Sequence, residues 1–285
     1  MTDELYYDFS NANRGIALIF NHEKFKDRDN RKGTKKDGDD LKAVLEGLQF
    51  DVRDYMDLNL NEIIEILFKG ETLEIFQFIF INLLLISVSR EDHSNNDCLL
   101  VTVMSHGMEE GTILAADREY NVQELWENFI GDNCKSLIGK PKLFFIQACR
   151  GSMVDPGVLL KPKQFALQLI SDDVDAHSTE PIFVIPKLAD LLVMYSTAEG
   201  HYAFRNPGDG SWFIQALCEE LKTNPQDDIL RILTGVNRRV AFAKQSHVPG
   251  NDRWDAAKQM PNIVSMLTKT MYFTKKTMKL NLENA

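Results

Sequence analysis

Short apolar runs alternate with amphipathic stretches along this chain. Runs buried on both faces of a sheet read as continuous apolar strands, and the pattern predicts strands at 16–20, 50–55, 98–104, 142–146 and 191–195. Apolar residues spaced three and four positions apart predict helices at 40–48, 59–67, 122–130, 212–221 and 227–244. A last strand region is predicted at 263–266 and 269–273.

This order of elements predicts an α/β fold with a mainly parallel sheet and helices on both faces. In such sheets, sites form outside the carboxyl ends of the strands. His106 lies just past the predicted strand 98–104, and Cys149 lies just past the predicted strand 142–146. We therefore expect both side chains at the same edge of the sheet.

Composition narrows the classes of partner. The net charge of -10 argues against nucleic acid and anionic membranes as main partners. The four cysteines form no Cys-x-x-Cys pair, so we expect no zinc site and no other cofactor. The acidic start has no basic and apolar leader, which together with reduced thiols favours a cytoplasmic protein.

Cys149 and His106 are the candidate reactive pair. A thiol with its ordinary pKa is only partly ionised at neutral pH, and a nearby imidazole can activate it and later protonate a leaving amine. Taken alone, a cysteine after a strand is usually a small core residue, and a histidine before glycine is usually a loop residue. Their context therefore decides between catalysis and packing.

That context is the pentapeptide Gln147-Ala-Cys-Arg-Gly151, with His106 lying 43 residues upstream of Cys149 (149 minus 106). This arrangement resembles the caspases, cysteine proteases that cut after aspartate. Further matching motifs are Ser105-His106-Gly107, Arg31-x-Gly-Thr with Asp39-x-Leu, Tyr195-Ser-Thr-Ala, Arg205-Asn and Gly210-Ser-Trp-Phe-Ile-Gln. The resemblance covers about 14–273 and is closest to the effector, insect-like branch. It implies a caspase-like sandwich around a central, mainly parallel six-stranded sheet.

The resemblance also implies roles for particular residues. Cys149 and His106 would be catalytic, and the backbone N–H groups of Gly107 and Cys149 would form the oxyanion hole. Arg31, Gln147 and Arg205 would bind the substrate aspartate through charge-assisted hydrogen bonds. Further substrate contacts are implied for Tyr202, Phe204, Asn206 and Trp212, with Trp254 as a candidate wall. Core packing is the alternative interpretation of the aromatic residues, and no third catalytic residue is evident.

The resemblance predicts a zymogen. Residues 1–175 would form the large subunit with the catalytic pair, and residues 176–285 the small subunit. A processing linker at about 153–190 would be cut after Asp175 in Asp172-Asp-Val-Asp175. The expected assembly is a homodimer of large and small pairs, joined through 269–273. Expected partners are protein substrates with exposed aspartate-containing loops, an activating protease and inhibitor-of-apoptosis proteins.

Residues 70–87 interrupt the resemblance with an apolar segment. Three interpretations stay open. The segment could be a membrane helix, but the 12-residue run 75–86 is too short to form one. It could also be a partner-binding helix or a translated, unspliced intron, and we favour the intron. On the last view the segment would leave Ile, Leu and Phe in water beside a core that is already filled.

Two rival functions follow. The insertion favours a catalytically impaired, caspase-like regulator or a disabled isoform, whereas the complete catalytic pair and pocket favour an active enzyme. A flavodoxin-like ligand-binding domain would need a glycine-rich phosphate loop after an early strand, and the sequence has none.

Overall fold

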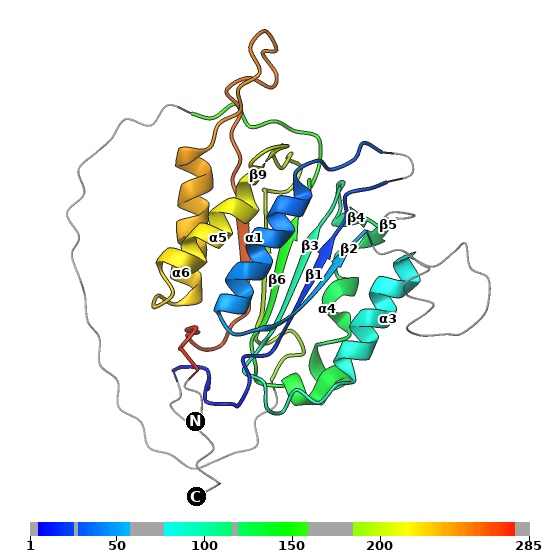
Figure 1. Cartoon of the computed structure of the whole chain (residues 1–285), viewed down its shortest axis with the longest axis vertical. Coiled ribbons are helices and arrows are strands. Elements are labelled where there is room, and N and C mark those ends of the chain that lie inside the picture. The colour runs from blue at the N-terminus through cyan, green and yellow to red at the C-terminus, as the bar shows by residue number, and fades with distance from the viewer. Residues whose placement is uncertain (1–4, 26–27, 58–76, 116–118, 159–184, 277–285) are drawn as a thin grey trace, which may run out of the picture.

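The computed structural model describes residues 5–25, 28–57, 77–115, 119–158 and 185–276. A six-stranded sheet with the strand order β10-β7-β6-β3-β1-β2 crosses the molecule (Figure 1). Its strands are β1 (Ile16–Asn21), β2 (Asp51–Met56), β3 (Leu99–Met104), β6 (Lys142–Gln147), β7 (Leu191–Tyr195) and β10 (Asn262–Ser265). All neighbours pair in parallel except β10, which runs antiparallel to β7. The predicted α/β fold with a mainly parallel six-stranded sheet is confirmed.

Alternate residues of the strands enter two separate hydrophobic clusters. In β1, Ala17 and Ile19 face the first cluster, whereas Ile16, Leu18 and Phe20 face the second. The strand is therefore buried on both sides, which explains why it reads as a continuous apolar run rather than an alternating one.

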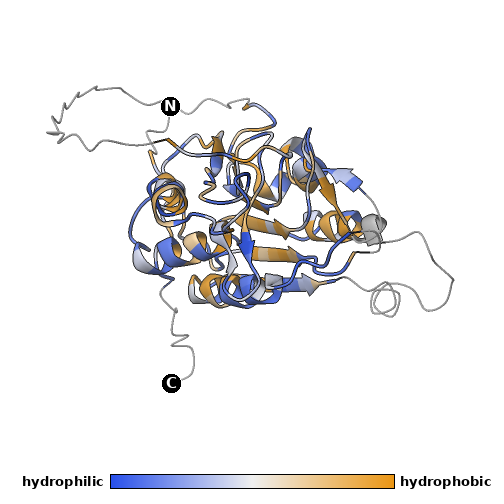
Figure 2. Cartoon of the chain, turned by 90° about the horizontal axis from the view of Figure 1, so that it is seen from above, coloured by the Kyte–Doolittle hydropathy of each residue, from blue (hydrophilic) through white to orange (hydrophobic). Residues whose placement is uncertain are grey.

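Helices cover both faces of the sheet. Figure 1 shows α1 (Thr34–Gly47), α5 (Trp212–Thr223) and α6 (Ile229–Arg238) on one face, and α3 (Gln77–Ser89) and α4 (Glu124–Glu127) on the other. Short helical turns follow at η1 (Gly131–Leu137) and η2 (Arg239–Ala243). In Figure 2 the apolar strands lie between helices that turn polar residues outward, the arrangement expected when each helix buries one stripe.

Several elements differ from the prediction. Residues 269–273 do not extend the sheet, because Thr270 and Tyr272 pair only in isolated bridges with Tyr6 and Asp228. The helix predicted at 122–130 shortens to α4, and the one predicted at 59–67 lies outside the described residues. Two short hairpins were not predicted, because two- and three-residue strands carry too little periodicity: β4 (Thr112–Leu114) with β5 (Glu119–Asn121), and β8 (Arg205–Asn206) with β9 (Gly210–Ser211).

The apolar segment at 70–87 contributes most of α3. Ile81, Leu85 and Val88 are buried in the second cluster, with exposed fractions of 1%, 0% and 2%. Only part of the helix surface is left open, as at Leu83 with 38% exposure. The expectation that this segment finds a filled core is therefore wrong for its second half, which itself supplies core. In the part of the chain that the structure describes, no helix is both long and apolar enough to cross a membrane.

The two ends of the predicted linker are tied to the folded part. Met153 pairs with His201, and Asp155 pairs with Lys258. Asp190 is buried and accepts hydrogen bonds from Tyr7 Oη at 2.7 Å and from Thr268 Oγ1 at 2.6 Å. The predicted cut after Asp175 lies outside the described residues.

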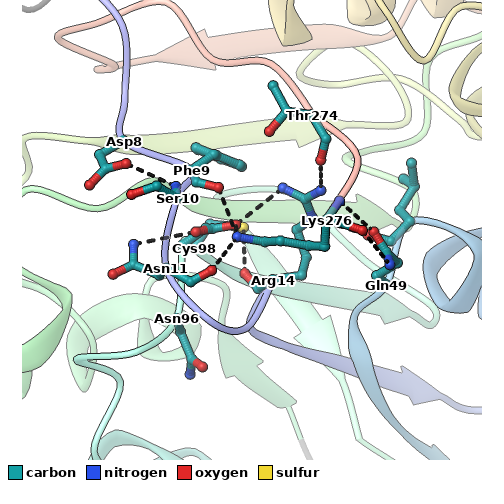
Figure 3. A network of polar contacts seen from close by, with 12 residues as sticks. Asp8, Phe9, Ser10, Asn11, Arg14, Gln49, Asn96, Cys98, Thr274 and Lys276 are labelled. Carbon is teal, nitrogen blue, oxygen red and sulfur yellow. Dashed lines mark hydrogen bonds and ion pairs between the residues drawn. The ribbon is translucent and has the colours of Figure 1, made fainter. Parts of the chain in front are cut away.

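A polar network closes the amino ends of the parallel strands (Figure 3). Arg14 donates to the buried carboxylate of Asp97 at 3.2 Å and to the carbonyl of Leu48 at 3.0 Å. Lys276 also pairs with Asp97 and donates to the carbonyls of Phe9 and Asn11 at 2.8 and 2.7 Å. The network thus joins the first and last described segments of the chain at the edge opposite the candidate site.

Candidate active site

The strand register brings His106 and Cys149 to one edge of the sheet. Met104 at the end of β3 pairs with Gln147 at the end of β6. His106 lies two residues after Met104, and Cys149 lies two residues after Gln147. Both line a cavity of about 650 Å³. The other lining residues are Ser105, Gln147, Ala203, Phe204, Arg205, Asn206, Pro207, Trp212, Gln245, Ser246, His247, Val248 and Trp254.

The thiol of Cys149 is partly buried in this cavity. Its Sγ accepts a hydrogen bond from the backbone N–H of Ala203 at 3.4 Å. Burial raises the pKa of Cys149, while the Ala203 bond and the positive charges of Arg31 and Arg205 act in the opposite direction. Because burial prevails, the thiol stays protonated at neutral pH and needs a base to ionise it.

The ring of His106 is oriented by a backbone carbonyl. Its Nε2 lies 2.8 Å from the carbonyl oxygen of Asp29. A carbonyl can only accept, so Nε2 carries the proton and Nδ1 keeps its lone pair. Burial lowers the pKa of His106, although the Asp29 bond raises it. The imidazole is thus neutral at pH 7 and can act as a base through Nδ1.

Arg31 is a buried cation with unused donors. Its Nη1 donates to the carbonyl of His22 and to Thr34 Oγ1, both at 2.8 Å. Its Nε and Nη2 have no partner among the described residues, and the same holds for Oε1 of the buried Gln147. Burial and the nearby charge of Arg205 lower the pKa of Arg31 to about 9, so the guanidinium is still charged at pH 7. Such unpaired buried donors are costly, which indicates a site built for an anion.

Arg205 reaches the same region from the β8–β9 hairpin. Its Nε donates to the carbonyl of Lys32 at 2.9 Å, so it is tied to the loop that carries Arg31. Asn206 also lines the cavity, but its Oδ1 accepts from the N–H groups of Gly208 and Asp209 at 2.7 and 3.1 Å. The Asn206 side chain therefore caps the hairpin turn.

Aromatic rings form the far wall of the cavity. Phe204 stacks on Trp212 with centroids 4.6 Å apart, and Trp254 meets Phe204 edge-on at 6.2 Å. Tyr202 packs against Trp254 at 4.8 Å but is not among the residues lining this cavity in the described chain. The rings thus pack on one another, and Phe204, Trp212 and Trp254 also line the cavity. Their contact with substrate stays a prediction.

Gly107 lies against the Cys149 loop. A Cβ at this position would come within 2.2 Å of the carbonyl oxygen of Cys149, so only glycine fits. Gly107 pairs with Ile113 in an isolated antiparallel bridge. The hydrogen bonds of this bridge are donated by the N–H groups of Met108 and Leu114, not by that of Gly107. Within the described residues, the N–H groups of Gly107 and Cys149 donate to no other group. Both are free to bind an oxyanion.

Comparison with known proteins now identifies the fold around this cavity. The family model of the caspase domain matches residues 14–70 and 80–272. The chain belongs to the caspase family. It is 39% identical to caspase drICE of Drosophila melanogaster over 95% of this chain and 73% of that protein. It is 38% identical to caspase-7 of Gallus gallus over 96% of this chain and 81% of that protein.

A solved structure agrees. The crystal structure of caspase-1 from Spodoptera frugiperda superposes with a TM-score of 0.80 and 37% identity, covering 97% of this chain and 98% of that one. Caspases are cysteine endopeptidases of apoptosis, made as zymogens and organised as dimers that act on protein substrates. This chain is therefore a cysteine-type endopeptidase of the effector kind.

The family match treats the apolar segment more narrowly than the sequence analysis did. It passes over only residues 71–79 and resumes at residue 80, inside the insertion predicted at 70–87. This agrees with the buried positions of Ile81 and Leu85 on α3. The second half of the segment thus belongs to the caspase fold of this chain.

Some groups in this caspase site escaped sequence reasoning. The carbonyl of Asp29 and the N–H of Ala203 are backbone groups, which carry no residue signature. Residues 245–248 line the cavity. The sequence could not predict this, because a loop without periodicity does not indicate where its side chains point. Within the described residues, no cluster of His, Cys, Asp and Glu is arranged to hold a metal ion.

Proposed function

We propose that this caspase hydrolyses peptide bonds on the carboxyl side of aspartate, with Cys149 as nucleophile and His106 as proton-transfer partner. The observation that carries this proposal is the buried guanidinium of Arg31, whose Nε and Nη2 are unpaired close to the thiol. An aspartate carboxylate supplies both acceptors that these donors lack. Arg205 and Gln147 complete the same pocket.

The protonation states define the order of events. Nδ1 of His106 takes the thiol proton as Sγ of Cys149 bonds to the substrate carbonyl carbon. The free N–H groups of Gly107 and Cys149 bind the resulting oxyanion. The C–N bond then breaks, and the amine leaves with the proton held by His106. Water hydrolyses the thioester, which releases the aspartate-ended product and restores the thiol.

Selectivity follows from the burial of the pocket. A neutral side chain of similar size, such as asparagine, leaves at least one cation without a counter-charge. A site built to pair a polar group rejects an analogue without that group by a factor of about 10⁴. The aromatic rings of Phe204, Trp212 and Trp254 would hold the residues that precede the aspartate.

Paired peptides test this proposal. The processed wild-type enzyme should cleave a peptide with aspartate before the cut and leave its asparagine twin almost untouched. Cys149→Ala should be inactive and folded, whereas Cys134→Ala, a buried cysteine outside the cavity, should keep its activity. Arg205→Ala should lose most of the aspartate preference. Cleavage of both peptides at similar kcat/KM by the wild-type chain would rule out the proposed specificity.

Assembly and activation extend the proposal. We infer that the large piece, 1–175, and the small piece, 176–285, arise by cleavage after Asp175 by an activating protease. The dimer would form through β10 rather than through 269–273, because β10 is the edge of the sheet and exposes Val264. A cytoplasmic location, and binding of inhibitor-of-apoptosis proteins, stay predictions from the family resemblance.

A further inference from the structure

Asp37 is a buried carboxylate directly beside the two-arginine pocket. It lies in the first turn of α1, with an exposed fraction of 0%. Its two oxygens accept from the backbone N–H of Ser211 at 2.8 and 2.9 Å, and Oδ2 also accepts from Ser211 Oγ at 2.5 Å. Gln215 Nε2 adds a bond to Oδ1 at 3.1 Å. Burial raises the pKa of Asp37, whereas the bonds from Ser211 and Gln215 and the charge of Arg31 act in the opposite direction. All four bonds are donated to its two oxygens, which is the pattern of an ionised carboxylate.

These bonds connect Asp37 to the position of Arg205. Ser211 is the strand partner of Arg205 in the β8–β9 pair. Gly210 has a φ of +92°, and a Cβ there would lie 2.2 Å from Asp37 Oδ1. The hairpin can therefore approach the carboxylate only because residue 210 is glycine. Ser211, which is bound to Asp37, thus holds its strand partner Arg205 in place.

The other side of Asp37 faces the Arg31 loop. Arg31 binds Thr34 Oγ1 at the start of α1, one helical turn before Asp37. Arg205 donates to the carbonyl of Lys32 in the same loop. A Cβ on Gly33 would meet the carbonyl oxygen of Pro207 at 2.7 Å, so loop and hairpin are in close contact. Asp37 thus lies where the two halves of the pocket meet.

Charge gives the carboxylate a second role. Burial lowers the pKa of both Arg31 and Arg205, and the charge of Arg205 lowers the pKa of Arg31 further. The Asp37 charge raises the pKa of both guanidiniums. Without substrate, two guanidiniums held together repel each other. The buried carboxylate partly neutralises this repulsion and does not occupy the unpaired donors of Arg31.

We propose that Asp37 is a positioning residue that sets the distance between Arg205 and Arg31, and so the length of acidic side chain that the pocket accepts. This proposal rests on the proposed cleavage after aspartate. Asp37 does not touch the substrate. It acts through Ser211 and the hairpin, and it supplies the counter-charge that keeps the empty pocket assembled.

The test is Asp37→Asn, compared with wild type on two peptides that differ only in aspartate or glutamate before the cut. The amide keeps the shape but brings an N–H₂ group towards donors of Ser211 and Gln215. A misplacement of about 1 Å can cost about 10²-fold in rate. We expect kcat/KM on the aspartate peptide to fall about 100-fold, mostly through KM, and the preference for aspartate over glutamate to fall about 10-fold.

Two controls separate positioning from general damage. Alkylation of Cys149 by neutral iodoacetamide should stay within about twofold of wild type, because the thiol and His106 are unaffected. Asp40→Asn is the matched variant, since Asp40 is on the same helix and accepts from Gln215 Nε2 at 3.2 Å but is partly exposed. It should retain kcat/KM and selectivity within about twofold.

An unchanged aspartate-to-glutamate ratio in folded Asp37→Asn would overturn the inference. Equal losses on both peptides together with slower alkylation would also overturn it, since they indicate a merely structural role. If Asp37→Asn does not fold, Ser211→Ala carries the test, because it removes only the hydroxyl bond; its ratio should fall about threefold, and no change refutes the idea. A processed wild-type enzyme that fails on the aspartate peptide refutes the proposed function itself.

Discussion

Replacing Leu85 by alanine should destabilise the fold strongly, although Leu85 lies in the apolar segment 70–87 that the sequence alone indicated as an insertion. Its side chain is 0% exposed and packs in the second hydrophobic cluster. Buried Leu→Ala changes cost about 2–5 kcal/mol, because transfer energy is lost and a cavity remains. For a domain of this size, each kcal/mol lowers Tm by about 2–4 °C. We therefore expect a drop of about 6–12 °C for a central cost of about 3 kcal/mol.

Leu83 provides the matched control on the same helix. It is 38% exposed, so the same substitution removes a side chain that is largely in water. Surface changes of this kind usually stay within about 0.5 kcal/mol. Both variants would be made in a Cys149→Ala background to prevent self-cleavage, and thermal unfolding would be followed by circular dichroism.

The difference between the two variants decides the role of the segment. A large shift for Leu85→Ala alone supports α3 as part of the core of this protein. Equal and small changes in Tm would show that 77–89 does not pack on the sheet in solution. They would support the alternative that 70–87 is an insertion that the fold does not need. That outcome would also contradict the family match resuming at residue 80.

Other predictions address the site, the linker and the network. Without substrate, the alkylation rate of Cys149 should keep rising above the ordinary thiol pKa of about 8.5, because burial raises the pKa of Cys149. A rate that reaches a plateau below neutral pH would contradict this. Asp175→Ala should keep the chain in one piece when an active caspase is added, as mass spectrometry would show; continued cleavage would move the site. Asp97→Asn should cost about 3–5 kcal/mol, measured by urea unfolding, because Arg14 stays buried without its counter-charge. Asp39→Asn, at the exposed pair with Lys35, should cost less than about 1 kcal/mol.

Local patterns determined most of the sheet. The strands at 16–20, 98–104, 142–146 and 191–195 were predictable because burial on both faces demands continuous apolar residues, and this demand is visible in the sequence. The positions of His106 and Cys149 after two of these strands could be read in the same way. The pentapeptide around Cys149 then indicated the family.

The insertion shows where local reading failed. An apolar run with no polar face does not indicate which side of the helix is buried. The sequence therefore could not show whether Ile81 and Leu85 are exposed to solvent or packed in the core. Packing against the sheet decided it. The last strand region was predicted too broadly for a similar reason: 263–266 and 269–273 are alike as short segments, and only pairing with β7 selects the first.

The sequence by itself determined the alternation of strands and helices and the places of His106 and Cys149 just after two strands, because each depends on residue type and short spacing. The roles expected for Arg31 and Arg205 came from the family resemblance and stay predictions. Only the tertiary structure decided how the pocket is held together. The Asp29 carbonyl that orients His106 and the Asp37 carboxylate that anchors Ser211 act across 77 and 174 positions of chain. Such contacts depend on the register of strands and hairpins in space, which no local pattern records.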